Sequence, residues 1–358
     1  NLGAPEVVLA YASRVAGAPT VISRFVQRLA AVAGEQPWAA ARARGEKYVR
    51  WARALDQPGA QRRIGKPRPT PPRAARPTSL SVTEIETWLR DPYSIYAKHI
   101  LELPVLDPVD LEPGASNRGI LLHAMLGDFS TQFRDALPEN AAEVLLRIAE
   151  RHFTALEDFP EARAFWWPRL VRIAHWFAAW DAGRRARAAS IIAEVSGRVR
   201  IPLDNERAFT LRARADRIEQ CTDDRYAILD FKTGTVPSDK QVQVGFSPQL
   251  SLEAAILRNG GFSEIPAGAS IAELVYVGLK GGEPAGEQHM VKLTEPSCDA
   301  HADRALAKVR SLIVSFDNDD QPYLPLVRPM WKARYGPYDH LARVKEWSVG
   351  EDEEQAIE

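Results

Sequence analysis

The strongest constraint on the fold comes from two neighbouring runs of apolar and β-branched residues, each of which carries an aspartate. Residues 226–232 read Tyr-Ala-Ile-Leu-Asp-Phe-Lys, a composition typical of a buried strand. Alternation along a strand places Asp230 and Lys232 on one face. A second strand-like run, 209–215, ends at Asp216, and the polar residues 220–225 have the length of a hairpin loop. The sequence therefore predicts that two carboxylates and one ammonium group converge.

This combination of charges has a specific chemistry. Oxygen ligands on adjacent strands can hold Mg²⁺, which lowers the pKa of a bound water and offsets the charge of a phosphate under attack. A lysine beside the ion can orient or activate that water. The same three residues also occur by accident on an ordinary solvated hairpin, so the wider context has to decide between the two interpretations.

Two further polar residues lie at the starts of expected helices. His123 follows Gly119 by four residues in an apolar run, and Gln249 opens the run Gln-Leu-Ser-Leu-Glu. Alone, each is typical of a structural or surface residue. In order, the chain shows G-x-x-x-H, an aspartate closing a strand, D-x-K and Q-L at a helix start. This series resembles the RecB-type nuclease domain of the PD-(D/E)XK superfamily, over residues 79 to about 347.

The resemblance implies a role for each of these residues. It implies a Mg²⁺ site, with Mn²⁺ as an alternative, whose ligands are the side chains of His123, Asp216 and Asp230 and the carbonyl of Phe231. Lys232 would be the catalytic lysine, and Gln249 would be a catalytic-site residue that positions groups near the scissile strand. Glu194 matches an earlier acidic residue of the family, although a solvent-facing glutamate on an alternating strand explains it equally well.

The implied fold is an α/β restriction-endonuclease-like core with a mixed sheet. Strands are expected at about 190–203, 207–216, 225–232, 271–278 and 288–293, with a helix near 299–316. A helical insertion at about 118–189 precedes this core. Its tryptophans have helical spacing and are expected in the hydrophobic core, with stacking on bases as the alternative: Trp166, Trp167, Trp176 and Trp180.

Both ends of the chain narrow the resemblance. Residues 1–56 look like the end of the helicase-like region of the B subunit of the AddAB helicase–nuclease, and residues 338–347 look like the C-terminus of its alphaproteobacterial form. We therefore expect a fragment of a longer protein. A linker at 57–77 would join the helicase-like remnant to the nuclease domain, 78–350, which an acidic tail, 351–358, follows.

The linker lies in the most basic part of the chain. Residues 42–76 hold eleven Lys or Arg and only two acidic residues, and 57–77 contains six prolines. This composition is typical of an extended tether, with contact to the DNA backbone as the alternative.

Two departures from the family pattern are informative. Many B subunits carry an iron–sulfur cluster, but here the place of the first ligand reads Arg90-Asp91-Pro92-Tyr93, and the two cysteines, Cys221 and Cys298, are too few for four ligands. No cluster is expected, and Asp91 is explained as a helix N-cap before Pro92. The family usually has a tyrosine four residues after the glutamine, where this chain has Glu253. We expect Glu253 to turn away from the substrate or pair with an arginine, and Glu253→Tyr to tighten DNA binding.

Composition limits the class of protein. No apolar run reaches the roughly 18 residues that cross a bilayer, and two distant cysteines argue against a disulfide scaffold, so a cytoplasmic protein without a membrane role is expected. With the resemblance, the expected function is a Mg²⁺-dependent deoxyribonuclease, an exonuclease acting on single-stranded ends in double-strand break repair and recombination with an AddA-type partner. The alternatives are a DNA-binding scaffold with little nuclease activity and a stand-alone exonuclease.

Overall fold

The structure is a computed structural model that describes residues 4–15, 17–57, 64–106, 112–203, 207–327 and 336–348. It divides into two compact units, Asn1–Ile64 and Gly65–Glu358. Among the described residues, no helix is both long enough and apolar enough to cross a membrane.

The first unit is a small helical hairpin with a short β-ribbon. Gly34, with a φ of 82°, ends the first helix and begins the second. None of the described side chains of this unit is buried, and Val21 and Phe25 are 90% and 80% exposed. Its elements are β1 (Arg14–Val15), β2 (Ala18–Pro19), α1 (Arg24–Ala33) and α2 (Glu35–Asp56).

The second unit is built on a mixed sheet, as the sequence predicts, which has six strands because a short strand at Ser79–Ser81 adds to the five expected ones. The order is β3-β5-β6-β7-β8, and β4 pairs with the other edge of β5. Two pairs are parallel, β3 with β5 and β6 with β7, and the other pairs are antiparallel. The strands are β3 (Ser79–Ser81), β4 (Ala188–Pro202), β5 (Ala208–Cys221), β6 (Tyr226–Lys232), β7 (Ile271–Leu279) and β8 (Gly286–Met290).

The prediction that Asp216 ends its strand is wrong. β5 continues through Asp216 to Cys221, because the residues after Asp216 pair with β4 on one side and β6 on the other. Even the polar Gln220 pairs with Tyr226. The connecting turn is short, and in it the Asp223 carboxylate accepts hydrogen bonds from the backbone and guanidinium of Arg225. Asp216 therefore lies in the middle of a rigid strand.

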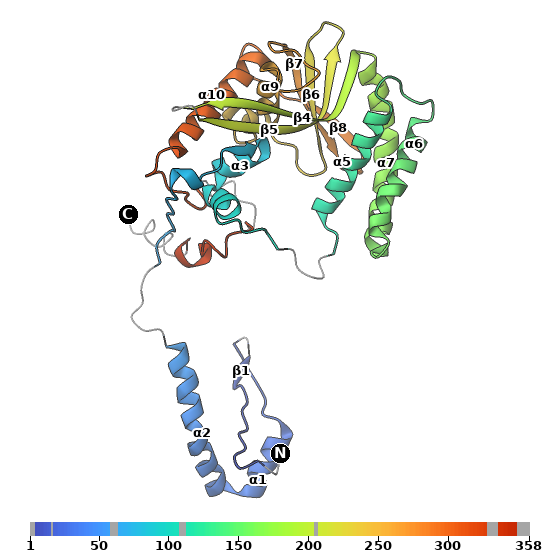
Figure 1. The fold of residues 1–358 in the computed structure, drawn as a ribbon. Coiled ribbons are helices and arrows are strands. Elements are labelled where there is room, and N and C mark those ends of the chain that lie inside the picture. The colour runs from blue at the N-terminus through green and yellow to red at the C-terminus, as the bar shows by residue number, and fades with distance from the viewer. Residues whose placement is uncertain are drawn as a thin grey trace. The chain divides into compact units, whose positions relative to one another are not determined.

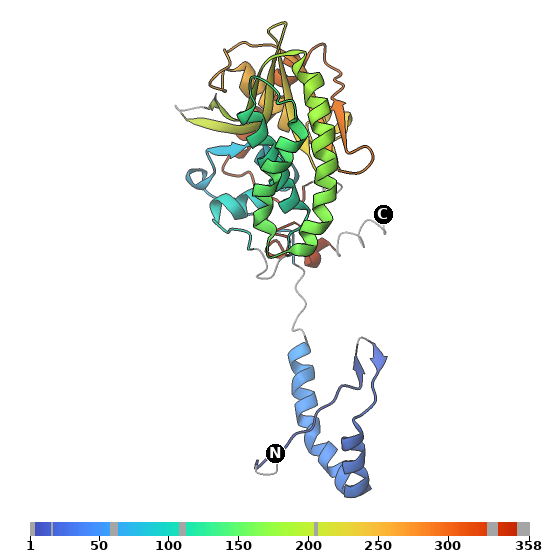
Figure 2. The same cartoon turned by 90° about the vertical axis from the view of Figure 1, so that its right-hand side faces the viewer.

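Helices cover both faces of the sheet (Figures 1 and 2). Alternation along β6 directs Ile228 to one core and Leu229 and Phe231 to the other. Three helices form the layer on the Phe231 side and correspond to the predicted insertion: α5 (Ala115–Gln132), α6 (Ala141–Phe153) and α7 (Pro160–Arg185). The helices that share the core with Ile228 are α3 (Val82–Arg90), α9 (Gln249–Arg258) and α10 (Cys298–Phe316).

A capping box forms at the start of α3, where Ser81 and Glu84 each accept a hydrogen bond from the other's backbone N–H. The remaining helices are η1 (Arg73–Ala75), α4 (Pro92–Ile95), η2 (Tyr96–Ile100), η3 (Thr154–Leu156) and α8 (Asp239–Val244).

The tryptophans of the helical layer are core residues, which confirms that interpretation over base stacking. Trp166 is buried, and Trp167, Trp176 and Trp180 pack against the same core. The rings of Trp176 and Trp180 stack with centroids 5.8 Å apart, and Trp180 meets the edge of the Phe231 ring. This packing fixes Phe231, the middle residue of the D-x-K motif, on the face of β6 opposite Asp230 and Lys232.

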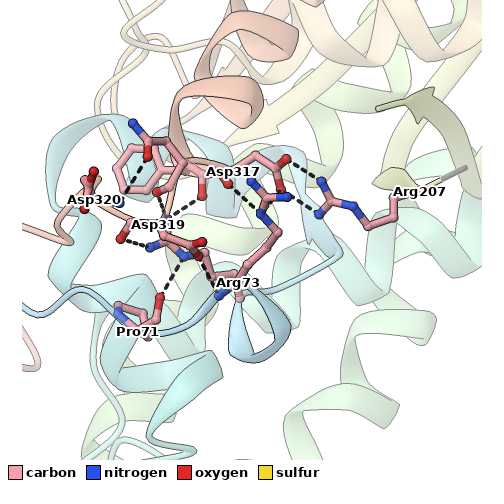
Figure 3. A network of polar contacts seen from close by, with 9 residues as sticks. Pro71, Arg73, Arg207, Asp317, Asp319 and Asp320 are labelled. Carbon is pink, nitrogen blue, oxygen red and sulfur yellow. Dashed lines mark hydrogen bonds and ion pairs between the residues drawn. The ribbon is translucent and has the colours of Figure 1, made fainter. Parts of the chain in front are cut away.

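Part of the predicted linker is held tightly to the second unit (Figure 3). The buried guanidinium of Arg76 donates to the carbonyls of Phe316, Asn318 and Asp319. Arg73 donates to the Asp317 carbonyl, and the Asp317 carboxylate also pairs with Arg207. These two arginines of the basic segment therefore bind protein.

The C-terminal segment packs beside α4 and η2. Tyr338, Ala342 and Trp347 form a small core with Tyr93 and Ala97. Asp91 occupies the N-cap position of α4, but its carboxylate does not cap the helix as predicted. It accepts instead from the Ser94 hydroxyl at 2.6 Å and the Leu326 N–H at 3.2 Å, which fastens a distant segment. The acidic tail, 351–358, lies outside the described residues.

Candidate active site

Asp230, Lys232 and Gln249 form one hydrogen-bonded group. Alternation on β6 predicts Asp230 and Lys232 on one face, and the family resemblance implies that Gln249 lies near them. The Lys232 ammonium donates to Asp230 Oδ1 at 3.1 Å and to Gln249 Oε1 at 2.9 Å. The Gln249 amide nitrogen donates to Asp230 Oδ1 at 2.5 Å. Asp230 is 1% exposed, whereas Lys232 remains partly open to solvent. A strand and a helix far apart in the sequence thus fix a buried carboxylate and an ammonium group together.

Asp216 and His123 form a second group beside the first. His123 Nδ1 lies 3.1 Å from Asp216 Oδ1, and the other Asp216 oxygen accepts the Phe231 N–H at 2.8 Å. The strand register pairs Arg217 with Leu229, so Asp216 and Asp230 are the next residues along, where the ladder ends. The peptide between Asp230 and Phe231 is therefore held directly by the second aspartate.

Two glycines bring α5 close to these strands. A Cβ atom on Gly119 would lie 3.1 Å from Thr233 Oγ1, just after β6. A Cβ on Gly127 would lie 2.6 Å from Glu194 Cγ, a separation that requires one of them to move. The first residue of the G-x-x-x-H motif thus has a packing reason, because it lets the helix approach until His123 reaches Asp216.

Glu194 joins Asp216 and His123 in an open cleft between α5 and the β4–β5 pair. The cleft has a volume of about 990 Å³, and its lining also includes Arg214 and Arg151. Glu194 has a φ of 52°, a left-handed conformation that non-glycine residues seldom adopt, and pairs with Arg214 at 2.7 Å. The structure therefore brings Glu194 to the site, in contrast to a purely solvent-facing position on a regular strand.

Burial sets the protonation of the site. Desolvation raises the pKa of Asp230 to about 6, against the opposing charge of Lys232. Burial acts to lower the pKa of Lys232, but the charge and hydrogen bond of Asp230 raise it overall. For His123, burial also acts downward, and the hydrogen bond and charge of Asp216 give a net rise. The pKa of Glu194 is raised by burial and by the charge of Asp216.

The donors fit a hard divalent cation by their chemistry, although they are engaged with one another. Two carboxylates, a backbone carbonyl and an imidazole match Mg²⁺ or Mn²⁺. Asp230 Oδ2 is buried and has no hydrogen-bond partner, and Lys232 is within 2.8 Å of it. Within the described residues, no three His, Cys, Asp or Glu side chains are grouped as a metal site. Metal binding therefore requires bonds such as His123 to Asp216 to be exchanged for bonds to the ion.

The predicted pairing of Glu253 with an arginine is wrong. Glu253 is 0% exposed, and its Oε1 accepts a hydrogen bond from the Gln249 amide nitrogen at 3.2 Å. Gln249 and Glu253 are four residues apart, which places both side chains on one helix face. This spacing was the sequence signal that could have predicted their contact. Packing, not repulsion from a phosphate, sets the position of Glu253, because α9 lies inside the domain and its middle residues are buried.

Comparison with known proteins places this arrangement in a family. The profile of the PD-(D/E)XK nuclease superfamily matches residues 79–338. The chain belongs to this superfamily. Proteins similar in sequence include an uncharacterized protein of Rickettsia bellii (strain RML369-C), 33% identical over 189 residues, which are 52% of this chain and 22% of that protein. An uncharacterized protein of Rickettsia conorii (strain ATCC VR-613 / Malish 7) is 34% identical over 194 residues, 52% of this chain and 23% of its own.

The match covers only part of the longer proteins. The aligned region is less than a quarter of the length of either relative. Among solved structures, the crystal structure of SSO0001 matches with a TM-score of 0.28 and 13% identity, over 66% of this chain and 76% of that one.

Proposed function

We propose that this PD-(D/E)XK domain hydrolyses phosphodiester bonds of DNA with a divalent metal ion, Mg²⁺ or Mn²⁺. The observation that carries the proposal is the Asp230–Lys232–Gln249 group beside the Asp216–His123 pair, within a domain whose superfamily consists of nucleases. A buried carboxylate tied to a lysine at the end of a strand is costly to keep unless it serves a function.

The proposed ligands come from three elements. The side chains of His123, Asp216 and Asp230 and the carbonyl of Phe231 would hold the ion. When bound, the ion supplies a water of lowered pKa and a positive charge for the phosphate oxygens. The Asp216 carboxylate accepts the Phe231 N–H at 2.8 Å, so it also holds in place the residue that would contribute the carbonyl.

The remaining residues would act on the water and the phosphate. Lys232, held by the Gln249 carbonyl at 2.9 Å, would orient the attacking water and offset the charge that develops on the phosphate. Arg214 and Arg151 line the cleft and would contact the DNA backbone. Glu194, which pairs with Arg214 in the cleft, would be a further acidic residue of the catalytic site.

We further propose that the substrate is a single-stranded DNA end delivered by an AddA-type helicase–nuclease subunit during break repair. The likeness of residues 1–56 and 338–347 to the B subunit of AddAB supports this partner. The exposed apolar side chains of α1, such as Phe25 and Val32, also support packing against a further protein surface. The alternatives are a scaffold role with little nuclease activity and a stand-alone exonuclease. The experiment below distinguishes them.

The function is tested by incubating the purified chain with an end-labelled single-stranded oligonucleotide, with Mg²⁺, with Mn²⁺ and with EDTA. We expect cleavage with either metal and none with EDTA, and slower cleavage of closed circular DNA. Binding of the oligonucleotide without cleavage under every metal condition would overturn the nuclease proposal in favour of the scaffold. Cleavage unaffected by a co-purified helicase subunit would favour the stand-alone enzyme.

Metal affinity is expected to fall as the pH is lowered from 8 to 5. Asp230, with a pKa of about 6, must be deprotonated to bind the ion, so at pH 5 only about one-tenth of it is competent and affinity drops about tenfold. His123 acts in the same direction because Asp216 raises its pKa. Mn²⁺ binding followed by electron paramagnetic resonance measures this, with circular dichroism confirming the fold at each pH. A flat profile would show that Asp230 is not a ligand.

A further inference from the structure

Helix α9 carries a buried carboxyl group that the recognised motifs do not include. Glu253 lies one turn after Gln249 and is 0% exposed. Its Oε1 accepts from the Gln249 amide, while its Oε2 is buried without a hydrogen-bond partner. A desolvated carboxyl with one unmet oxygen costs free energy, so its position beside the catalytic group calls for a physical explanation.

The hydrogen bonds of Gln249 supply that explanation. The amide nitrogen of Gln249 has two acceptors, Asp230 Oδ1 at 2.5 Å and Glu253 Oε1 at 3.2 Å, and the amide oxygen has one donor, Lys232 Nζ at 2.9 Å. An amide that rotated by 180° would place its nitrogen against the ammonium group and its oxygen against two carboxyl groups. Asp230 and Glu253 together therefore select a single orientation of the Gln249 side chain.

We propose that Glu253 is a positioning residue of the nuclease site, whose carboxyl holds the Gln249 amide in the orientation that keeps Lys232 and Asp230 in place. It acts through Gln249. Burial, reinforced by the charges of Asp230 and Asp216, raises the pKa of Glu253 well above its usual value, which supports a neutral carboxyl in this position. A glutamine at 253, with a carbonyl of the same shape, is then a close mimic. The inference rests on the proposed nuclease function.

The first test compares two variants at this position. Glu253→Met keeps the length of the side chain and removes the acceptor, and it should lower kcat about 10- to 100-fold, as loss of an outer-shell partner does, with KM for DNA nearly unchanged. Glu253→Gln should restore kcat to within about threefold of the wild type, because it keeps the acceptor. Wild-type kcat in Glu253→Met, or no rescue by Glu253→Gln, would overturn the proposal.

A matched control comes from the same helix. Ser251 is equally buried on α9, but its hydroxyl bonds to His301 Nε2 at 2.8 Å, with no contact to Gln249. Ser251→Ala should leave kcat unchanged while lowering thermal stability. A loss of kcat in Ser251→Ala as large as that in Glu253→Met would show that any buried polar change on α9 disturbs catalysis, and the specific role of Glu253 would fall.

A double-mutant cycle separates positioning from a general structural effect. If Glu253 acts through Gln249, then Glu253→Met in a Gln249→Met background should cause no further loss of kcat. Additive losses would overturn the proposal. Should Glu253→Met fail to fold, Glu253→Leu is used; unfolding of both apolar variants while Glu253→Gln folds would also overturn it, because a hydrogen-bond acceptor at position 253 would then be needed for folding itself.

A readout without DNA or metal keeps the two proposals distinguishable. In the metal-free ¹⁵N-labelled protein, the side-chain amide signals of Gln249, identified by their absence in Gln249→Met, should show slow exchange in the wild type and in Glu253→Gln. Exchange should be fast in Glu253→Met. If the wild type does not cleave DNA, the proposed function fails, while this measurement still tests the positioning. Unchanged exchange in Glu253→Met would overturn the positioning alone.

Discussion

Replacing Lys232 by alanine is expected to lower kcat by about 10²- to 10⁴-fold, the range associated with a positioned proton-transfer or charge-stabilising group. The ammonium contacts Asp230 and Gln249 but belongs to no proposed ligand set, so metal binding and DNA binding should persist. Cleavage rates are measured at saturating DNA, with Mn²⁺ affinity and DNA affinity determined separately.

The pH of that experiment matters. Lys232 lowers the pKa of Asp230, so its removal raises that pKa further above the value of about 6. Cleavage by both proteins is therefore measured as a function of pH, which separates this shift in the pKa of Asp230 from the effect of the lysine itself. Lys240→Ala, an exposed lysine on α8, is the matched control and should retain wild-type kcat. Parallel loss of metal affinity and cleavage in Lys232→Ala would assign the lysine to holding the site together instead.

Local sequence was sufficient for the parts of the site that lie on regular elements. Alternation on a seven-residue apolar strand correctly placed Asp230 and Lys232 together and Phe231 in the opposite core, because a strand has only two faces. The position of Gln249 in the first turn of a helix followed from the same kind of periodicity. These predictions needed no knowledge of distant contacts.

The positions of the other residues depend on tertiary contacts that the local sequence pattern does not specify. Asp216 was expected at a strand end, but pairing with both β4 and β6 extends β5 beyond it. Asp91 was expected to cap a helix, whereas its carboxylate accepts a hydrogen bond from the backbone N–H of Leu326, over two hundred residues later in the sequence. Glu253 was expected to turn away from the substrate or to pair with an arginine, and only the packing of α9 shows that it is buried beside Gln249.

A buried group of charges explains why β5 can present Asp216 rigidly. Arg217, the next residue, is 0% exposed and lies 2.6 Å from Asp181 Oδ1 on α7 and 2.8 Å from Glu219 Oε1. Neither contact has the angle of a hydrogen bond, so charge attraction holds them. Arg184 of α7 also pairs with Glu219 and reaches Glu273 on β7. The helix layer is thus fastened to the strand directly beside the proposed ligand.

Arg217→Met is therefore expected to lower the free energy of unfolding by about 3 kcal/mol, the lower end of the range for breaking a buried ion pair, because Asp181 loses this partner but keeps Arg185. Urea denaturation of the metal-free protein measures this change. Arg225→Met removes an exposed pair with Asp223 and should cause no measurable change. At temperatures where Arg217→Met remains folded, its Mn²⁺ affinity should fall by about tenfold or more, since Asp216 loses the anchor of its neighbouring residue. Wild-type affinity in a destabilised Arg217→Met would show that the hairpin with β6 alone positions Asp216, and that the buried charges serve only the stability of the fold.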